Sequence, residues 1–448
     1  MHEPQLRPEE ILRALQRLPP APRYVVAYST GPDSTALLDC LARTREQLPG
    51  SLAAAHIHHG LNRRADQWAE LAERECARRD IPLAVLRVSV HDTGEGIEAA
   101  ARQARYAALE QCLGDGHALL TGQHADDQAE TILLQLLRAS GPRGLAGMPE
   151  ERALGCGRLL RTLLGWRKAA LIEYCQRRRL DYTVDPQNEA PEHDRNWLRH
   201  EILPRLQSRW PRTVENLGIS ARLLGESETL LHAATERWLE QVTASGKDIL
   251  ELARLRALEP PVQRRVVRLA IEHLQLPQPP RRQLEELLRQ AAAAAGDRSP
   301  VIEWQGGIAR IHDSRLYLQG DWHAPAIQPA DWRPPADWYQ PGIGRLRLEP
   351  ADDQSQPRSH DWPVLRVRGR CGGERIDLGG QRRAVKELMR EARLPPWQRE
   401  ALPLVYAGER LVAVADFWLD HAFSKRLQGS GLRLRWLPIT PADRPSRG

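Results

Sequence analysis

The sequence predicts an α/β protein that begins with a parallel sheet covered by helices on both faces. A helical middle region and a small α+β unit follow. The length of 448 residues suits two or three domains. Short apolar runs alternate with helical periodicity over roughly the first 200 residues, which is typical of βαβ units. From 214 to 296 the periodicity is helical, and after 343 both patterns are mixed.

The first region contains strand-like runs, each followed by a helical segment. The runs cover 24–28, 52–58, 83–90, 117–122 and 158–164; the helices begin near 34 and then span 64–79, 97–113, 125–138 and 167–179. Helices between successive strands argue for a parallel sheet with right-handed crossovers. We therefore expect a Rossmann-like sheet that binds its ligands at the carboxyl ends of the strands.

Changes of pattern place the domain boundaries. We expect an N-terminal domain over 1–213, a mostly helical domain over 214–322 and a C-terminal α+β domain over 343–448. Residues 301–320 read as strands at the end of the middle domain. The stretch 323–342 is rich in proline and tryptophan, which predicts a linker.

Composition limits the expected cellular compartment and the expected class of binding partner. No apolar run is long enough to cross a membrane, and the charged N-terminus lacks the features of a signal peptide. The six cysteines are far apart and form no C-x-x-C pair, so we expect a reducing cytoplasm and no zinc site. The net charge is +6, and only four of the 64 basic residues are lysines. This arginine content fits a polyanionic partner, although a GC-rich genome explains it equally well.

A polar turn, STGPDST at 29–35, joins the first strand to the first helix of the sheet. Backbone N–H groups at a helix N-terminus attract anions, and Gly31 allows a ligand to approach the backbone closely. Asp33 suits a phosphate pocket only if it holds a metal ion that bridges to the phosphate. Ordinary helix capping by serine or aspartate is the competing interpretation.

This turn resembles the PP-loop of N-type ATP pyrophosphatases, S-G-G-x-D-S. Thr30 stands where that motif has its first glycine, and Pro32 occupies the variable position. The resemblance implies that residues 29–35 bind the phosphates of ATP and that Asp33 helps to hold Mg²⁺. The ATP-binding residues expected from it are Ser29, Thr30, Gly31, Pro32, Asp33, Ser34 and Thr35.

A second motif, HADDQAETILLQLL, follows the fourth predicted strand. On a helical wheel one stripe is apolar, and it is formed by Ala125, Ala129, Ile132, Leu133 and Leu136. Asp126 and Glu130 lie one turn apart on a flank of this stripe, facing the expected ligand crevice. They are candidates for binding the ammonium group of an amino acid or a metal ion. The alternative is an acidic first turn that stabilises the helix dipole, which explains Glu130 less well.

The segment 121–148 resembles the signature of the tRNA(Ile)-lysidine synthetase family, with Gln123 in place of a histidine and Ala139 in place of a glycine. Four further stretches match in order: 56–62, 98–106, 185–206 and 366–414. Arginines three residues apart in the second stretch suit phosphate, although a solvated helix face is the alternative. The polar side chains singled out in this way are His56, Arg102, Arg105, Arg138, Asn188, Arg195, Asn196, Arg199, Arg382, Arg383, Lys386 and Arg390.

The resemblance implies one reaction. ATP adenylates the wobble cytidine of a tRNA(Ile) with the anticodon CAU, and free L-lysine then displaces AMP to give lysidine. It implies that residues 29–34 bind the ATP phosphates and that Asp33 helps to hold Mg²⁺. We add as hypotheses that Asp126 and Glu130 act with Asp33 in catalysis and bind the lysine ammonium or the metal, and that Arg105, Arg138 and Arg199 neutralise phosphates. His56 is a further candidate for binding ATP, and the candidates for binding the lysine or RNA substrate are Asp126, Glu130, Arg138, Arg195, Asn196, Arg382, Arg383 and Lys386.

Three alternatives remain open at the level of the sequence. A basic helical face around Arg382–Arg390 is either an RNA grip or a solvated surface. A tRNA thiolase is a rival enzyme, although the paired cysteines of the nearest thiolases are not visible. A non-catalytic RNA-binding protein is the second rival, with Thr30 as its main support. The pattern does not distinguish a monomer from a homodimer.

Overall fold

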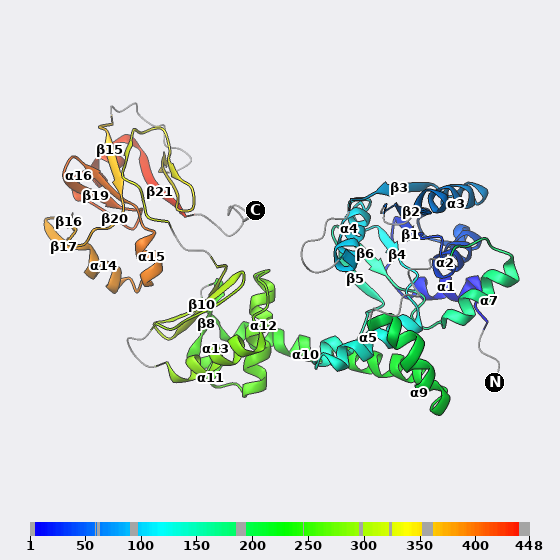
Figure 1. The fold of residues 1–448 in the computed structure, drawn as a ribbon. Helices are drawn as coiled ribbons and strands as arrows, with labels where there is room; N and C mark the ends of the chain where they lie inside the picture. Colours follow the sequence, from blue (N-terminus) through cyan, green and yellow to red (C-terminus); the bar gives the residue numbers. More distant parts are fainter. Residues whose placement is uncertain are drawn as a thin grey trace. The chain divides into compact units, whose positions relative to one another are not determined.

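The computed structural model describes residues 5–58, 60, 63–89, 97–184, 194–244, 246–294, 299–321, 325–351 and 362–438; at 97–99 and 101 it describes the backbone alone. The chain divides into two compact units, Met1–His232 and Ala233–Gly448 (Figure 1). The predicted position Asn188 lies outside the described residues. Among the helices in those ranges, none has the length and apolar character needed to cross a bilayer.

The first unit is built on a six-stranded sheet with the strand order β3-β2-β1-β4-β6-β5. The strands are β1 (Arg23–Ala27), β2 (Ser51–His58), β3 (Leu83–Arg87), β4 (Ala118–Leu120), β5 (Glu151–Leu154) and β6 (Gly157–Leu160). Neighbouring strands run parallel except β5, which pairs antiparallel with β6. The parallel sheet expected from the sequence is therefore confirmed, with an additional antiparallel strand at one edge.

Helices surround this sheet, and three of them follow the strands that carry the site. They are α1 (Pro8–Gln16), α2 (Pro32–Arg43), α3 (Ala65–Arg78), α4 (Ile97–Gln111), α5 (Ala125–Leu137), α6 (Pro142–Leu145), α7 (Lys168–Arg178), α8 (Asp194–Trp197), α9 (Leu203–Arg209) and the start of α10 (Thr213–Val242). A short 3₁₀ turn covers Arg45–Gln47, and a π-helical turn, η3 (Leu198–Ile202), joins α8 to α9.

The alternation of side chains along β1 explains why helices cover both faces. Tyr24 and Val26 point into one hydrophobic core with residues of α1, α2, α3 and α7. Val25 points the other way, into a second core that contains Leu109 of α4. Successive strand residues face opposite sides of a sheet, so two-sided burial requires the continuous apolar run seen here.

The first part of the second unit combines helices with a five-stranded sheet. Its elements are β7 (Thr243–Ala244), β8 (Gly246–Glu251), α11 (Leu252–Arg256), α12 (Pro260–His273), α13 (Arg281–Ala293), β9 (Val301–Trp304), β10 (Gly307–His312) and β11 (Arg315–Gln319). The predicted helices and the strands within 301–320 are confirmed. The two strands between 243 and 251 were not expected, and they extend the sheet in the order β7-β8-β11-β10-β9.

The last part of the chain has its own hydrophobic core, from Ile327 to Trp436. Its strands are β12 (Ala330–Trp332), β13 (Trp338–Gln340), β14 (Gly344–Pro350), β15 (Leu365–Arg368), β16 (Arg375–Leu378), β17 (Gln381–Ala384), β18 (Leu404–Ala407), β19 (Arg410–Val414), β20 (Trp418–Leu419) and β21 (Leu432–Pro438). Its helices are α14 (Val385–Glu391), α15 (Pro396–Glu400) and α16 (His421–Ser430).

The described part of the expected linker, 325–342, instead contributes to this last core. Strand β12 pairs with β15, and β13 pairs with β14. Trp332 and Trp338 are buried in the core. The tryptophans that made the segment look unusual are the reason it folds, since each removes a large apolar surface from water.

Candidate active site

A cavity of about 580 Å³ opens at the carboxyl ends of β1, β2 and β4. From β1 the chain continues to β2 and β3 on one side of the sheet, and then crosses to β4 and β6 on the other side of β1. The strand order therefore reverses between β1 and β4. Ligands of open α/β sheets bind at such a switch point. The turn after β1 forms one wall, and residues of α4, α7 and η3 form others.

The turn after β1 takes its shape from Thr30 rather than from Gly31. Thr30 has a φ of +64°, in the left-handed region that side chains with a branched Cβ rarely adopt. Gly31 has an ordinary φ of −71°, and a Cβ there would meet only Ser29 Oγ at 3.5 Å. Pro32 is the first residue of α2, where a missing N–H breaks no helical hydrogen bond. Neither departure from the PP-loop motif therefore disrupts the turn.

The two serines of the turn bond within the turn itself. The Ser29 N–H donates to Ser34 Oγ at 3.2 Å, and the Ser34 hydroxyl donates to the Gly31 carbonyl at the same distance. Ser29 and Ser34 also lie 3.1 Å apart through their Oγ atoms. No side chain caps α2, and its first residues, Pro32, Asp33 and Ser34, line the cavity. The helix N-terminus therefore lies where an anion in the cavity can bind.

Asp33 carries an oxygen that no protein group satisfies: its Oδ1 is buried without a hydrogen-bond partner. Burial raises the pKa of this carboxyl above its usual range, although His124 and Lys168 oppose the shift. An orphaned buried carboxylate oxygen in a cavity is the arrangement that a bound cation or a proton would satisfy.

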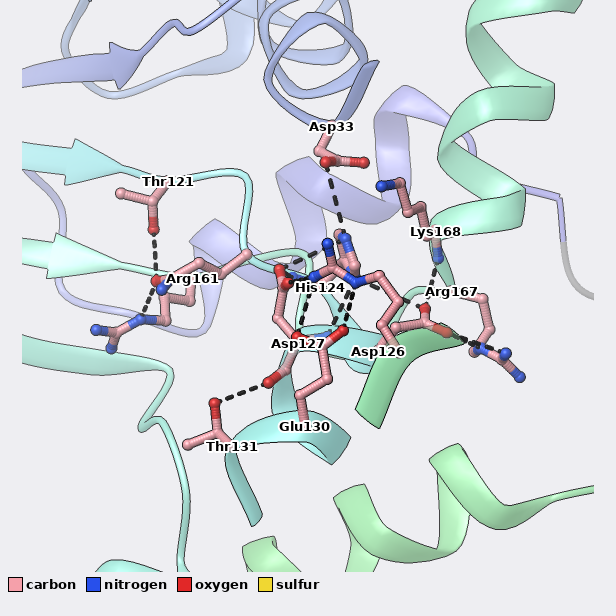
Figure 2. Close-up of polar contacts among 12 residues, drawn as sticks. Asp33, Thr121, His124, Asp126, Asp127, Glu130, Thr131, Arg161, Arg167 and Lys168 are labelled. Carbon is pink, nitrogen blue, oxygen red and sulfur yellow. Dashed lines mark hydrogen bonds and ion pairs between the residues drawn. The ribbon is translucent and has the colours of Figure 1, made fainter. Parts of the chain in front are cut away.

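His124 connects Asp33 to the start of α5. Figure 2 shows the imidazole among three carboxylates, with Nε2 at 3.7 Å from Asp33 and 3.4 Å from Asp127, and Nδ1 at 3.6 Å from Asp126. His124 is also the N-cap of α5, because its side chain accepts from the Asp127 N–H while Asp127 accepts from the His124 N–H. This reciprocal capping fixes the helix start that carries the acidic residues.

Asp126 is held from the side of α7. Its Oδ1 accepts from Arg167 Nε at 3.1 Å, and its Oδ2 accepts from the Lys168 backbone N–H at 2.8 Å. Burial alone would raise the pKa of Asp126, but the bonds from Lys168 and Arg167 outweigh it and leave the pKa below its usual value. Asp126 therefore stays ionised and ties the start of α5 to the start of α7.

Glu130 is completely buried and is held by arginines. Arg199 of η3 donates to both its oxygens, from Nε at 2.6 Å and from Nη2 at 3.0 Å. The same Nη2 reaches Asp127 at 3.1 Å, and Arg195 lies 3.6 Å from Glu130. Burial raises the pKa of Glu130, and Arg199 opposes that shift.

The structure separates the predicted residues into two groups. The cavity wall includes most of the turn from Ser29 to Ser34, together with His56, Arg102, Arg105 and Arg199. Asp126 and Glu130 are not part of this wall; their partners Lys168 and Arg199 are. Arg138 is exposed at the far end of α5, outside the wall, and Asn196 is buried on α8. His56 is buried and its Nδ1 lies 2.8 Å from the Tyr28 carbonyl, which places the ring proton on that nitrogen.

The prediction of a continuous buried stripe on α5 is wrong at its end. Ala125, Ala129 and Ile132 are buried, but Leu136 is 59% exposed. The helix ends at Leu137, and the chain then turns through Ala139 with a φ of +52°. The last turn of α5 thus projects beyond the helices that cover its beginning.

Sequence reasoning missed Lys168 and a buried arginine, Arg161. Lys168 opens α7 beside the cavity. Arg161 donates from Nε to Gln123 Oε1 at 2.5 Å, and Thr121 donates to the same oxygen at 3.1 Å. Both basic residues follow β6, so the rule that ligands gather at strand ends would have found them.

The residues present fit a divalent cation that also binds a phosphate. Within the described ranges, no group of three or more His, Cys, Asp or Glu side chains could enclose a metal ion. Mg²⁺ usually takes one or two carboxylates and completes its shell with phosphate oxygens and water. The orphaned Oδ1 of Asp33 beside the phosphate-binding turn suits that mode.

The basic residues predicted in the C-terminal part do not form one helical face. Arg382 and Arg383 lie on β17, whereas Lys386 and Arg390 lie on α14. Gly379 and Gly380 form the turn between β16 and β17, both with positive φ. A Gly-Gly pair marks a hairpin, so this signal could have corrected the prediction. Arg382 and Lys386 are exposed, and Arg383 forms an ion pair with Glu391.

Three family models match separate parts of the chain. The family model of the PP-loop domain matches 6–206, that of the TilS substrate binding domain matches 250–317, and that of the TilS substrate C-terminal domain matches 365–436. Among solved structures, a U34-tRNA thiolase from Methanococcus maripaludis superposes with a TM-score of 0.41 at 15% identity, covering 49% of this chain and 78% of the other.

Curated relatives match over nearly the whole length. The tRNA(Ile)-lysidine synthase of Alkalilimnicola ehrlichii is 42% identical over 434 residues, which cover 94% of this chain and 96% of the relative. The enzyme of the same name from Pseudomonas aeruginosa is 41% identical over 446 residues, covering 96% and 97%. The one from Coxiella burnetii is 35% identical, covering 94% of both chains. Since the domain models match in order and the relatives span the chain, the protein belongs to the tRNA(Ile)-lysidine synthase family, PP-loop ligases that use ATP.

Proposed function

We propose that this enzyme attaches free L-lysine to C2 of the wobble cytidine in tRNA(Ile) with the anticodon CAU. The cytidine O2 attacks the α-phosphorus of ATP and releases pyrophosphate. The lysine ε-amine then adds to C2, loses a proton and displaces AMP. The product, lysidine, changes decoding from AUG to AUA and tRNA identity from methionine to isoleucine. The reaction takes place in the cytoplasm, a reducing compartment that suits the six free cysteines.

The cavity wall supplies the groups that ATP needs. The N–H groups at the start of α2 and the hydroxyls of the turn 29–35 bind the leaving pyrophosphate. Arg105, Lys168 and Arg199 line the same cavity and neutralise phosphate charge. Asp33 would hold Mg²⁺, and the ion would supply positive charge to offset the negative charge of the leaving pyrophosphate. His56 lines the wall beside the turn as a further contact for the nucleotide.

Asp126 and Glu130 are proposed to serve the lysine side of the reaction. Both are already bonded to cations or N–H groups behind the wall, so they act first by orienting Arg199 and the start of α7. The carboxylate cluster around His124 also supplies the negative potential that an incoming ammonium group seeks. Loss of lysine affinity in Asp126→Asn, with ATP affinity retained, would support this assignment.

The observation that carries the proposal is the contact between the two motifs beside one cavity. His124 links the phosphate-binding turn to the acidic start of α5, since it lies within 3.7 Å of both Asp33 and Asp126. Lys168, which lines the cavity, donates its backbone N–H to Asp126. An intact turn removes the main support for a decayed, non-catalytic RNA-binding protein.

The direct test incubates the purified chain with ATP, Mg²⁺, labelled lysine and a tRNA(Ile) transcript bearing CAU. We expect label in the RNA that depends on ATP, and none in a matched transcript whose wobble cytidine is replaced by uridine. Release of AMP and pyrophosphate without label in the RNA would preserve the ATP chemistry and reject the lysine acceptor. Label in both transcripts would reject the wobble cytidine as the target.

RNA binding is proposed to extend to the C-terminal part through Arg382, Arg383 and Lys386, and to the N-terminal unit through Arg138, Arg195 and Asn196. Neutralising phosphate contacts weakens binding and flattens its dependence on salt. Replacing the three C-terminal residues by alanine should therefore weaken tRNA binding about fivefold or more and reduce the salt slope. Unchanged affinity at low salt would make them a solvated surface.

A further inference from the structure

Thr30 is bonded to the segment that follows α7. It is fully buried, and its Oγ1 lies 2.8 Å from Thr183 Oγ1. The Thr183 N–H also donates to the Thr30 carbonyl at 2.8 Å. A glycine at position 30 would keep the backbone bond and lose the bond between hydroxyls.

The directions of these hydrogen bonds follow from proton counting. Thr30 Oγ1 lies 2.6 Å from the Ser29 carbonyl, which can only accept, so the Thr30 proton is directed there. The Thr183 hydroxyl must then donate to Thr30 Oγ1. Valine at 183 would keep the shape and remove this donor, whereas serine would keep the donor.

One end of this contact lies in the cavity wall and the other directly behind it. Tyr182, Thr183 and Val184 line the cavity, whereas Thr30 is buried between the lining residues Ser29 and Gly31. We propose that Thr30 and Thr183 form a polar clasp that positions the phosphate-binding turn against the Tyr182–Val184 wall before ATP arrives. This inference rests on the use of ATP proposed above and makes both threonines positioning residues.

The clasp offsets the energetic cost of a backbone conformation that threonine disfavours. A β-branched residue at a φ of +64° holds its place only when its surroundings fix it, and the bonds to Ser29 and Thr183 do so. Without the clasp, the turn would be displaced in part of the molecules. The apparent Kd for ATP would then equal the intrinsic Kd divided by the fraction of molecules that keep the turn in place. The ATP-bound turn would be the same, so kcat at saturating ATP should stay constant while KM rises.

The test measures ATP binding by calorimetry in the presence of Mg²⁺ and in the absence of tRNA and lysine. Thr183→Val should raise the Kd for ATP by about three- to tenfold, and Thr183→Ser should stay within about twofold of the parent. Thr44→Val is the matched control, since Thr44 is a buried threonine at the other end of α2 whose hydroxyl donates to the Cys40 carbonyl at 3.0 Å. It should leave the Kd unchanged.

A double-mutant cycle separates the clasp from general loosening. In a Thr30→Gly background, Thr183→Val should have no further effect on the Kd, because the partner hydroxyl is already absent. Thr183→Ala replaces the valine variant if melting curves show that valine prevents folding.

Three results would overturn the clasp. They are parental affinity in a folded Thr183→Val protein, an equal loss in Thr44→Val, and additive effects in the cycle. A parent chain that fails to bind ATP would reject the proposed function as well. Parental binding with an unaffected valine variant would reject the clasp alone.

Discussion

The phosphate-binding turn and the acidic start of α5 lie on either side of His124. They differ in whether their buried carboxylate oxygens have partners. At the turn, Asp33 keeps a buried oxygen with no partner. At α5, Glu130 is fully buried and both its oxygens are taken by Arg199. The turn keeps an unsatisfied oxygen that a ligand can complete, whereas the carboxylate on α5 already has its partners and gives rigidity. Stability and activity should therefore respond to different carboxylates.

The largest effect is expected for stability at Glu130. Glu130→Gln removes the buried charge that pairs with the half-buried Arg199 and leaves Asp127 as its hydrogen-bonded carboxylate, so the free energy of unfolding should fall by about 3 kcal/mol. Urea denaturation checks this, with Glu173→Gln as the control. Glu173 is an exposed residue paired with Arg177 at 3.8 Å, and its loss should cost less than about 0.5 kcal/mol. Equal losses in the two variants would contradict the comparison.

Replacing Asp33 should reduce catalytic activity and leave the fold intact, the reverse of the effect expected at Glu130. Asp33→Ala removes the carboxylate proposed to hold Mg²⁺, so AMP formation should drop by at least about 100-fold, or about 2.7 kcal/mol in the barrier. Release of AMP from labelled ATP measures it, alongside a thermal melt. Near-parental AMP release from the folded variant would remove Asp33 from the metal role.

The contact between Gln123 and Arg161 extends the comparison, because here a neutral side chain holds a buried arginine. Gln123 accepts from Arg161, whose pKa is lowered by burial. Gln123→Leu should cost about 1–3 kcal/mol, since it leaves a buried donor unsatisfied. Gln123→His keeps an acceptor nitrogen and should cost less than about 1 kcal/mol. Chemical denaturation of the two variants decides this, and a larger cost for histidine would contradict the role of the acceptor.

The smallest effect concerns pH. Because burial raises the pKa of Asp33 in the folded state, its charged form destabilises the fold above that pKa, and the penalty disappears as the pH falls through it. Asp33→Asn should therefore melt about 1–3 °C higher than the parent at pH 8, with a difference that shrinks towards acidic pH. Scanning fluorimetry across pH measures it. A difference that grows on acidification would reverse the sign of the argument.

The sequence predicted the elements with strong local patterns. The strand–turn–helix around Asp33 and the helix that begins at Ala125 lie where expected. The pairing of Arg199 with Glu130 could not be predicted, because 69 residues separate them and only the folded chain brings them together. The prediction of a linker was wrong, because the tryptophans within 323–342 were interpreted as part of an irregular segment, whereas Trp332 and Trp338 belong to the hydrophobic core.

The departures at Thr30 and Ala139 show what a pattern does and does not specify. Both stand where the family signature has glycine, and both have a positive φ, at +64° and +52°. Such a φ suits glycine and costs threonine or alanine about 1 kcal/mol each. A motif names the residue that adopts a geometry most easily, so a departure from the motif does not by itself show that the geometry is lost.

The antiparallel edge strand β5 has a consequence for handling the protein at high concentration. An open sheet edge invites strand pairing with another chain, and short charged strands discourage it. β5 has only four residues, and two of them are Glu151 and the exposed Arg152. The opposite edge, β3, ends in the exposed Arg87. The sheet that carries the site is thus protected at both margins from aggregation by strand exchange.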